Sequence, residues 1–179
     1  MTFETPSFFM KNIPYYCQCK ILILGCGNIL FGDDGFGPQV ADELTNNYNL
    51  PEDVEVINAG SSVRNILFDI TLSEEKPEKI IIVDAIDAGK TPGEIFEIPI
   101  DEIPENKIDD FSMHQIPTSN LLKELKDICK IDIVILACQV ETIPEEVTGR
   151  ISKSVSEAIP RACKKINVII TNNSDKYLP

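Results

Sequence analysis

A strand, a glycine-rich turn and the start of a helix follow one another between Ile21 and Pro38, and this succession constrains the fold more than any other segment. It reads Ile-Leu-Ile-Leu-Gly-Cys-Gly-Asn-Ile-Leu-Phe-Gly-Asp-Asp-Gly-Phe-Gly-Pro. The first four residues are all apolar, which is typical of a strand that helices cover on both faces of a sheet. Pro38 suits the first turn of a helix. A turn between such a strand and helix commonly binds a phosphate or a dinucleotide.

The residues of the turn argue against both of those ligands. Gly27 and Gly32 have the spacing of a phosphate-binding loop, but Asp33 and Asp34 stand where that loop carries Lys and Ser or Thr. A dinucleotide site would need a third glycine where the chain has Leu30. Because carboxylates repel phosphate and attract cations, the turn is better suited to a metal ion.

Strands and helices are expected to alternate along the rest of the chain. Apolar runs predict strands at residues 54–57, 80–83 and 131–138, and helical spacing predicts helices from residues 38, 63 and 121 and between 151 and 162. Pro160 is expected to kink or break the last helix. Residues 94–98 alternate like an antiparallel edge strand. The pattern predicts a single three-layer α/β/α domain, with a mainly parallel, twisted sheet of about five strands and helices on both faces.

Charge and cysteine content exclude several classes of protein. A formal net charge of −13 argues against nucleic acid, whose phosphates need Lys and Arg, and against an anionic membrane surface. No apolar run approaches the roughly 18 residues of a membrane span, and the N-terminus lacks the pattern of a signal peptide. We therefore expect a cytoplasmic protein that binds neither nucleic acid nor membranes. A monomer is also expected, although no pattern in the sequence specifies the oligomeric state.

The six cysteines do not suggest a disulfide framework. Four of them fall in or beside apolar patterns and are expected to be buried or half-buried free thiols: Cys26, Cys129, Cys138 and Cys163. Cys17-Gln-Cys19 lacks the second Cys pair or the paired His that a zinc site needs.

Acidic residues and one histidine are expected at one edge of the sheet. Ligands of parallel α/β sheets bind at the carboxyl ends of the strands, and this edge should carry Asp33, Asp34, Asp84 and Asp87. His114, the one histidine in the sequence, comes just before a helix and can lie at the same edge. Two carboxylates and an imidazole would suit nickel, zinc, cobalt or iron. Ordinary structural roles stay open for each residue, such as a helix cap, a turn hydrogen bond or a surface position.

Three motifs together resemble the hydrogenase maturation endopeptidases, which process the large subunit of nickel–iron (NiFe) hydrogenases. The motifs are the turn at residues 25–38, Ile81-Ile-Val-Asp-Ala-Ile-Asp-Ala-Gly89 followed by Pro92-Gly93-Glu94, and Met113-His-Gln-Ile116. They occur in the family's order and at compatible distances, from about Ile21 to Ile166. The resemblance implies an N-terminal extension of unknown role at residues 1–19, a maturation protease-like α/β domain at 20–170 and a C-terminal tail at 171–179.

The resemblance also implies a substrate and a site. Members of the family remove a C-terminal extension from the large-subunit precursor after nickel has been inserted into it. Nickel would arrive in the precursor as the recognition signal, and other divalent transition metals could replace it in vitro. Carried over by position, the metal-contacting and catalytic residues are Asp34, Asp84 and His114, and Asp33 is then expected to cap the following helix. The implied partner is the precursor. Abundant Ile, Lys and Glu are typical of a thermophile such as a methanogenic archaeon, and on that ground we expect a deazaflavin-reducing hydrogenase as the client.

The mechanism is limited by what the sequence lacks. It has no Gly-x-Ser-x-Gly nucleophile elbow, and a single histidine excludes His-Glu-x-x-His. Attack by a water molecule that is metal-bound, or activated by Asp34 or Asp84, is therefore favoured, with the choice of base left open. Two alternatives are a non-enzymatic nickel- or precursor-binding chaperone that uses the same three residues, and a nucleotide-binding α/β enzyme.

Overall fold

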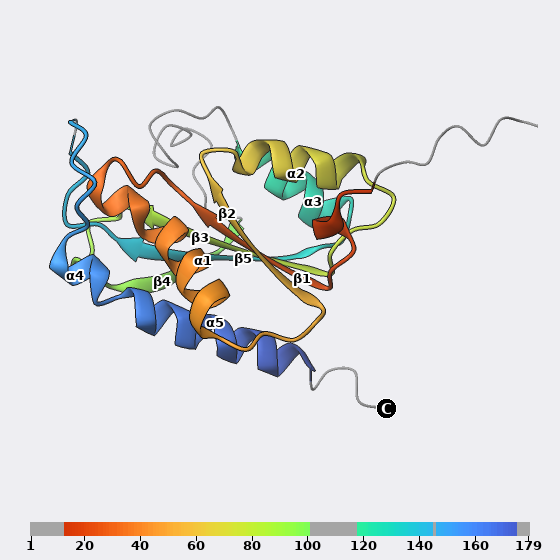
Figure 1. Cartoon of the computed structure of the whole chain (residues 1–179). Coiled ribbons are helices and arrows are strands. Elements are labelled where there is room, and N and C mark those ends of the chain that lie inside the picture. Colours follow the sequence, from red (N-terminus) through yellow and green to blue (C-terminus); the bar gives the residue numbers. More distant parts are fainter. Residues whose placement is uncertain (1–12, 101–117, 145, 175–179) are drawn as a thin grey trace, which may run out of the picture.

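Strands and helices alternate along the chain (Figure 1). The computed structural model describes residues 13–100, 118–144 and 146–174. The elements in chain order are the 3-10 helix η1 (Tyr15–Cys17), β1 (Ile21–Cys26), the 3-10 helix η2 (Gly32–Gly35), α1 (Phe36–Asn47), β2 (Val54–Gly60), α2 (Val63–Leu72), β3 (Lys79–Ile86), β4 (Ile95–Ile98), α3 (Thr118–Asp127), β5 (Asp132–Gln139), α4 (Lys153–Ser156) and α5 (Ile159–Ser174).

The described strands form one five-stranded sheet in the order β2-β1-β3-β5-β4. β1 pairs in parallel with β2 and β3, and β3 pairs in parallel with β5. β4 pairs antiparallel with β5 and forms an edge. β1 and β3 are buried along their whole length, as expected from the apolar runs Ile21–Leu24 and Ile80–Val83 within them. The predicted mainly parallel sheet with an antiparallel edge strand is confirmed.

Helices cover both faces of the sheet. α1 and α5 lie on one face, and α2 and α3 lie on the other (Figure 1). Side chains of β1 alternate between the two cores: Ile23 packs on the side of α1 and α5, and Leu22 and Leu24 pack on the side of α2 and α3. Because each face is closed by its own pair of helices, the predicted three-layer α/β/α domain is confirmed.

The residues just before β1 pack against the second core. Cys17 is buried at the end of η1, and Ile13 also contacts this core. The Tyr16 hydroxyl donates to Asp69 Oδ2 of α2 at 2.8 Å. The boundaries expected for the extension (1–19), the domain (20–170) and the tail (171–179) stay a prediction.

The last helical pattern is divided into two helices. α4 ends at Ser156 and α5 begins at Ile159, so the break expected near Pro160 is confirmed. Proline has no N–H to donate, and it is tolerated in the first turn of α5, where that donor would have no intrahelical partner. None of the helices in the described part of the chain is long and apolar enough to cross a membrane.

Candidate functional site

Two buried aspartates from different elements converge at the carboxyl edge of the sheet. Asp34 lies in η2, shortly after β1, and Asp84 lies in the last part of β3. Their exposed fractions are only 8% and 3%. β1 and β3 are neighbouring parallel strands, so the segments that end them lie side by side. The structure therefore brings together two of the three site residues expected from the sequence.

Close packing of α1 on the strands places Asp34. A Cβ at Gly37 of α1 would collide with the carbonyl oxygens of Cys26 and Val83, and a Cβ at Gly25 would collide with the carbonyl oxygen of Gly37. Glycine at both positions lets the helix backbone approach β1 and β3. Because η2 directly precedes α1 in the chain, this contact also places Asp34 near the end of β3.

Hydrogen bonds within the turn orient Asp34. The Asn28 N–H lies 2.7 Å from Asp34 Oδ2 and 3.1 Å from the Asp34 carbonyl oxygen, and it donates to both. Asn28 Oδ1 in turn accepts from the N–H of Leu30 at 3.0 Å. Gly27 has a φ of 121°, and a Cβ there would collide with the Asp34 carbonyl oxygen. The conformation of the turn and the direction of the Asp34 carboxylate thus depend on each other.

Asp84 holds its proton far more tightly than an ordinary aspartate. Burial and, second, the charge of Asp34 raise the pKa of Asp84 from 3.8 to about 7, while a hydrogen bond from the Ala85 N–H to Oδ1, 2.8 Å long, lowers it. A carboxyl with a pKa near neutrality can accept and release a proton at physiological pH. Two neighbouring carboxylates are also stabilised by sharing a cation or a proton. The pair is therefore suited to proton transfer or to metal contact.

Asp33 does not cap α1, and the expectation that it would do so was wrong. The cap position of α1 is Gly35, and no side chain accepts a hydrogen bond there. The Asp33 carboxylate is instead buried, with an exposed fraction of 1%, and accepts from the N–H groups of Glu141 (2.8 Å), Thr142 (3.0 Å) and Ser152 (2.6 Å) and from the Ser152 hydroxyl (3.0 Å). These partners lie 108 to 119 residues further along the chain. Asp33 therefore joins the turn after β1 to the loop after β5.

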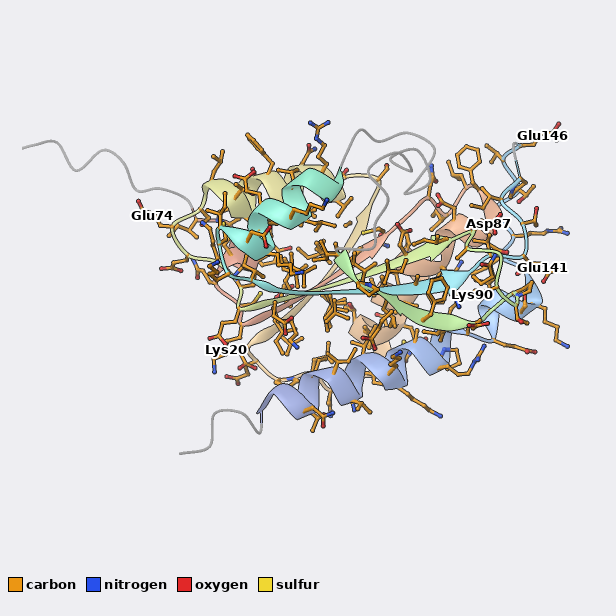
Figure 2. All side chains as sticks on the ribbon, turned by 180° about the vertical axis from the view of Figure 1, so that it is seen from behind. Lys20, Glu74, Asp87, Lys90, Glu141 and Glu146 are labelled. Carbon is orange, nitrogen blue, oxygen red and sulfur yellow. The ribbon has the colours of Figure 1, made fainter. Side chains whose placement is uncertain are left out.

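Gln139 organises a third loop at this edge, and no sequence motif marks it. Its buried amide accepts from the N–H groups of Ala88 (2.8 Å) and Lys90 (3.0 Å), and its Nε2 donates to Asp87 Oδ1 (3.0 Å). Asp87 and Glu141 point outward at the same end of the molecule (Figure 2). The one signal available in the sequence was a polar residue directly after an apolar strand.

The cysteines are free thiols, as expected. Cys17, Cys26, Cys138 and Cys163 are buried, and Cys19 and Cys129 are partly buried. Cys26 is the one whose pKa responds to the site: burial, then the charges of Asp84 and Asp34, raise it well above its ordinary value. Burial also raises the pKa of Cys19 to about 11 and that of Cys17 above its ordinary value. Raised pKa values oppose the thiolate form, which a nucleophile or a metal ligand needs.

His114 lies outside the described residues, so its expected place beside the two aspartates stays a prediction. Within the described ranges, no group of three or more His, Cys, Asp or Glu side chains is placed to hold a metal ion. Asp34 and Asp84 form an incomplete metal site by themselves. A third ligand would have to come from His114 or from a bound substrate.

A sequence profile described as hydrogenase maturation protease matches residues 38–169. The chain belongs to this family. A putative hydrogenase maturation protease of Methanocaldococcus jannaschii is 44% identical over 148 residues, which span 82% of this chain and 93% of that protein. The coenzyme F420 hydrogenase subunit delta of Methanothermobacter thermautotrophicus is 36% identical over 158 residues, spanning 86% of this chain and 95% of that protein.

Solved structures agree with this assignment. The HycI maturation protease of NiFe hydrogenase from Thermococcus kodakarensis superposes with a TM-score of 0.69 at 29% identity, covering 85% of this chain and 92% of that chain. The hydrogenase maturating endopeptidase HybD of Escherichia coli, at 24% identity, shows the same fold with a TM-score of 0.68, covering 86% and 93% of the two chains.

As a hydrogenase maturation protease, the chain is an endopeptidase of the class that its three motifs resembled, and that prediction is confirmed. The matched profile includes Asp84 and His114 and begins four residues after Asp34. The roles of the individual residues belong to the proposal that follows.

Proposed function

We propose that this protease removes the C-terminal extension of a NiFe hydrogenase large-subunit precursor and recognises the nickel that the precursor carries. The observation that supports this most directly is the pair Asp34 and Asp84, two buried carboxylates at the strand edge where ligands bind in this class of fold. A buried carboxylate pair gains most from a partner that brings positive charge. A nickel ion held by the substrate brings such a charge.

Asp34, Asp84 and His114 are the residues that we assign to the metal and to catalysis. Two carboxylates and an imidazole suit nickel and other divalent transition ions, and discriminate against magnesium and calcium. In this proposal the ion arrives already bound by the precursor. The other ligands of the ion would then belong to the precursor.

Peptide cleavage then requires a water molecule and a base. Water attacks the scissile carbonyl carbon, the C–N bond breaks, and the proton lost by the water passes to the leaving amine. Either Asp34 or Asp84, the two buried carboxylates at this edge, can carry that proton. The raised pKa of Cys26 is unfavourable for a thiolate nucleophile, which supports direct attack by water.

The client that we propose is a deazaflavin-reducing hydrogenase, acted on by a monomeric protease in the cytoplasm. The 36% identity to a protein named as a subunit of coenzyme F420 hydrogenase supports the choice of client. Six free cysteines suit a reducing compartment.

The test is cleavage of a nickel-loaded precursor by the purified protease, followed by mass spectrometry of the shortened large subunit. Asp34→Ala, Asp84→Ala and His114→Ala should each reduce the cleavage rate at least about a hundredfold, since each removes a group placed at the reacting centre. Asp53→Ala is the matched control, because Asp53 forms only an exposed ion pair with Lys20. Full processing by all three site variants would refute the assignment.

Two further measurements separate the alternatives. A chaperone would bind the nickel-loaded precursor and shift its elution volume without shortening it. A nucleotide-binding enzyme would be stabilised by nucleotides in a thermal-shift screen. The carboxylates of Asp33 and Asp34 in the turn disfavour this alternative, because they repel phosphate.

A further inference from the structure

Three large apolar side chains are exposed on two loops beside the candidate site. Ile29 and Leu30 of the turn after β1 have exposed fractions of 54% and 48%, and Val147 of the loop after β5 has one of 65%. We name these three residues the apolar rim. Exposed apolar residues scattered singly are ordinary on a protein surface, whereas a group next to a reactive site marks a contact for a ligand or partner.

Hydrogen bonds join the two loops of the rim. The Leu30 carbonyl oxygen accepts from the N–H groups of Thr148 at 3.1 Å and Gly149 at 3.2 Å. Figure 1 shows the turn after β1 and the loop after β5 side by side at the same end of the sheet. The buried Asp33 carboxylate, in the turn after β1, also accepts hydrogen bonds from the loop after β5. The two loops that carry the apolar rim are therefore held together, so a partner that docks on them need not order the loops first.

The rim is also connected to the candidate site through Asn28. The Leu30 N–H donates to Asn28 Oδ1 at 3.0 Å, and the Asn28 N–H donates to Asp34 Oδ2 at 2.7 Å. One residue thus links the backbone of the rim to a carboxylate of the site. A polypeptide that presents its scissile bond to Asp34 and Asp84 would have to run close to Ile29 and Leu30.

Charge argues against a second copy of this chain as the occupant of the rim. The chain has a formal net charge of −13, and Asp87, Glu141 and Glu146 lie at the same end of the molecule (Figure 2). Lys90 also lies at this end but pairs with Glu94 at 3.3 Å, so two copies meeting here would still bring an excess of carboxylates together, which opposes association. Under the proposed function, in contrast, the protease admits a polypeptide to this edge in every catalytic cycle.

We infer that the apolar rim is a docking surface for an apolar segment of the large-subunit precursor, next to the peptide bond that is cut. The inference rests on the proposed function and adds the residues that bind the protein substrate. Ile29, Leu30 and Val147 bind the segment without contacting the reacting atoms. Removing these side chains should therefore weaken binding of the precursor equally in the ground state and in the transition state. KM should rise while kcat stays nearly unchanged.

The experiment measures both binding and cleavage of a nickel-loaded large-subunit precursor from the same organism. Leu30→Ser and the triple variant Ile29→Ser/Leu30→Ser/Val147→Ser are compared with Leu72→Ser. Leu72 is an exposed leucine that ends α2 shortly before β3 begins, at the opposite edge of the sheet. Circular dichroism and thermal unfolding establish that each variant is folded. Gel filtration reports the oligomeric state of each variant.

We expect Leu30→Ser to raise the Kd for the precursor and the KM about three- to tenfold, the triple variant to raise both more, and kcat to stay within about twofold. Leu72→Ser should behave as the unchanged protein. An unaltered Kd and KM in the folded triple variant would overturn the inference. So would a change from dimer to monomer in the triple variant with precursor affinity unaltered, because the rim would then join two copies of the protease.

Failure of the proposed function gives a different result. If the unchanged protease binds the precursor through the rim and does not cut it, the docking surface stands and the cleavage proposal fails. If the unchanged protease does not bind the precursor at all, the docking surface is refuted as well.

Discussion

Asp33 and Asp34 are adjacent in the chain, and their carboxylates end in different surroundings. Asp33 is satisfied by three N–H groups and one hydroxyl, so its charge is balanced within the fold. Asp34 accepts from the Asn28 N–H and faces Asp84, whose pKa it raises. One residue therefore stabilises the loops at this edge, and its neighbour sets the electrostatics of the candidate site.

Replacing Asp33 with alanine should destabilise the fold strongly. Asp33→Ala leaves the N–H groups of Glu141, Thr142 and Ser152 without their acceptor, and we expect a loss of about 2–4 kcal/mol in the free energy of unfolding. Urea unfolding measures it, with Asp53→Ala as the control, for which an exposed ion pair predicts a loss within about 0.5 kcal/mol. Equal stabilities of the two variants would contradict the role assigned to Asp33.

Replacing Asp84 with asparagine should stabilise the protein in a pH-dependent manner. The pKa of Asp84 is about 7 in the folded state and 3.8 in the unfolded state, so binding of its proton stabilises the folded state. This contribution is complete below pH 3.8 and is lost as the pH rises to about 7. An asparagine side chain cannot ionise, and its amide oxygen can keep the hydrogen bond from the Ala85 N–H. We expect Asp84→Asn to be more stable at pH 8, by up to roughly 4 kcal/mol, with a gain that shrinks towards pH 4.

Urea unfolding of Asp84→Asn at pH 8, 6.5 and 5 measures this gain. Asp53→Asn, at the exposed ion pair with Lys20, is the control and should show no comparable trend. A gain that is the same at pH 8 and pH 5 would show that ionisation of Asp84 is not its cause.

At the scale of elements, the contact between α1 and the strands β1 and β3 determines where the turn lies. Gly25 and Gly37 face each other across this contact, with no room for a Cβ at either position. Apolar side chains of α1 then fill one core, among them Phe36, Val40 and Leu44. The glycines set the separation, and the apolar residues stabilise it by burial.

Gly37→Ala should therefore disrupt both the helix contact and the site. The added methyl group would collide with backbone carbonyl oxygens of Cys26 and Val83, which cannot rotate away. We expect a loss of about 2 kcal/mol or more in the free energy of unfolding, together with reduced precursor cleavage. Asn46→Ala, at an exposed position of the same helix, is the control and should change stability by about 0.5 kcal/mol or less. Unchanged stability of Gly37→Ala would mean that the helix can move away without cost.

At the scale of the whole molecule, the dominant electrostatic feature is the excess of acidic residues. The sequence has 29 Asp and Glu residues against 16 Lys and Arg residues, and its isoelectric point is about 4.4. A large net charge opposes a compact state through self-repulsion. The buried pair Asp34 and Asp84 adds to that repulsion at a single place.

Salt should consequently stabilise the protease at neutral pH. Raising NaCl from about 0.01 M to about 1 M shortens the Debye length from roughly 30 Å to roughly 3 Å, which screens most surface repulsion. We expect the Tm at pH 7.5 to rise by about 2–6 °C over this range. At pH 5, closer to the isoelectric point, the rise should be much smaller. A Tm at pH 7.5 that does not depend on salt would show that net charge contributes little to stability.

Much of the fold could be predicted because its signals are local. The apolar runs of β1 and β3, the alternation of β4 and the break near Pro160 each follow from side chains close together in the sequence. The shared edge of Asp34 and Asp84 could be predicted as well, because parallel strands end at the same side of a sheet. The helix-cap role expected for Asp33 failed because its true partners are more than a hundred residues away.

The class of fold, the family, and the edge at which the acidic residues meet could be inferred from the sequence alone. Those properties depend on the periodicity of apolar residues and on motifs that can be recognised in order. Three properties depend on the folded chain: which backbone groups donate to Asp33 and to Asp34, how far burial raises the pKa of Asp84, and that the loops carrying Ile29, Leu30 and Val147 are hydrogen-bonded to each other. Hydrogen bonding and desolvation depend on distances between segments that are remote in the chain, and no local pattern encodes those distances.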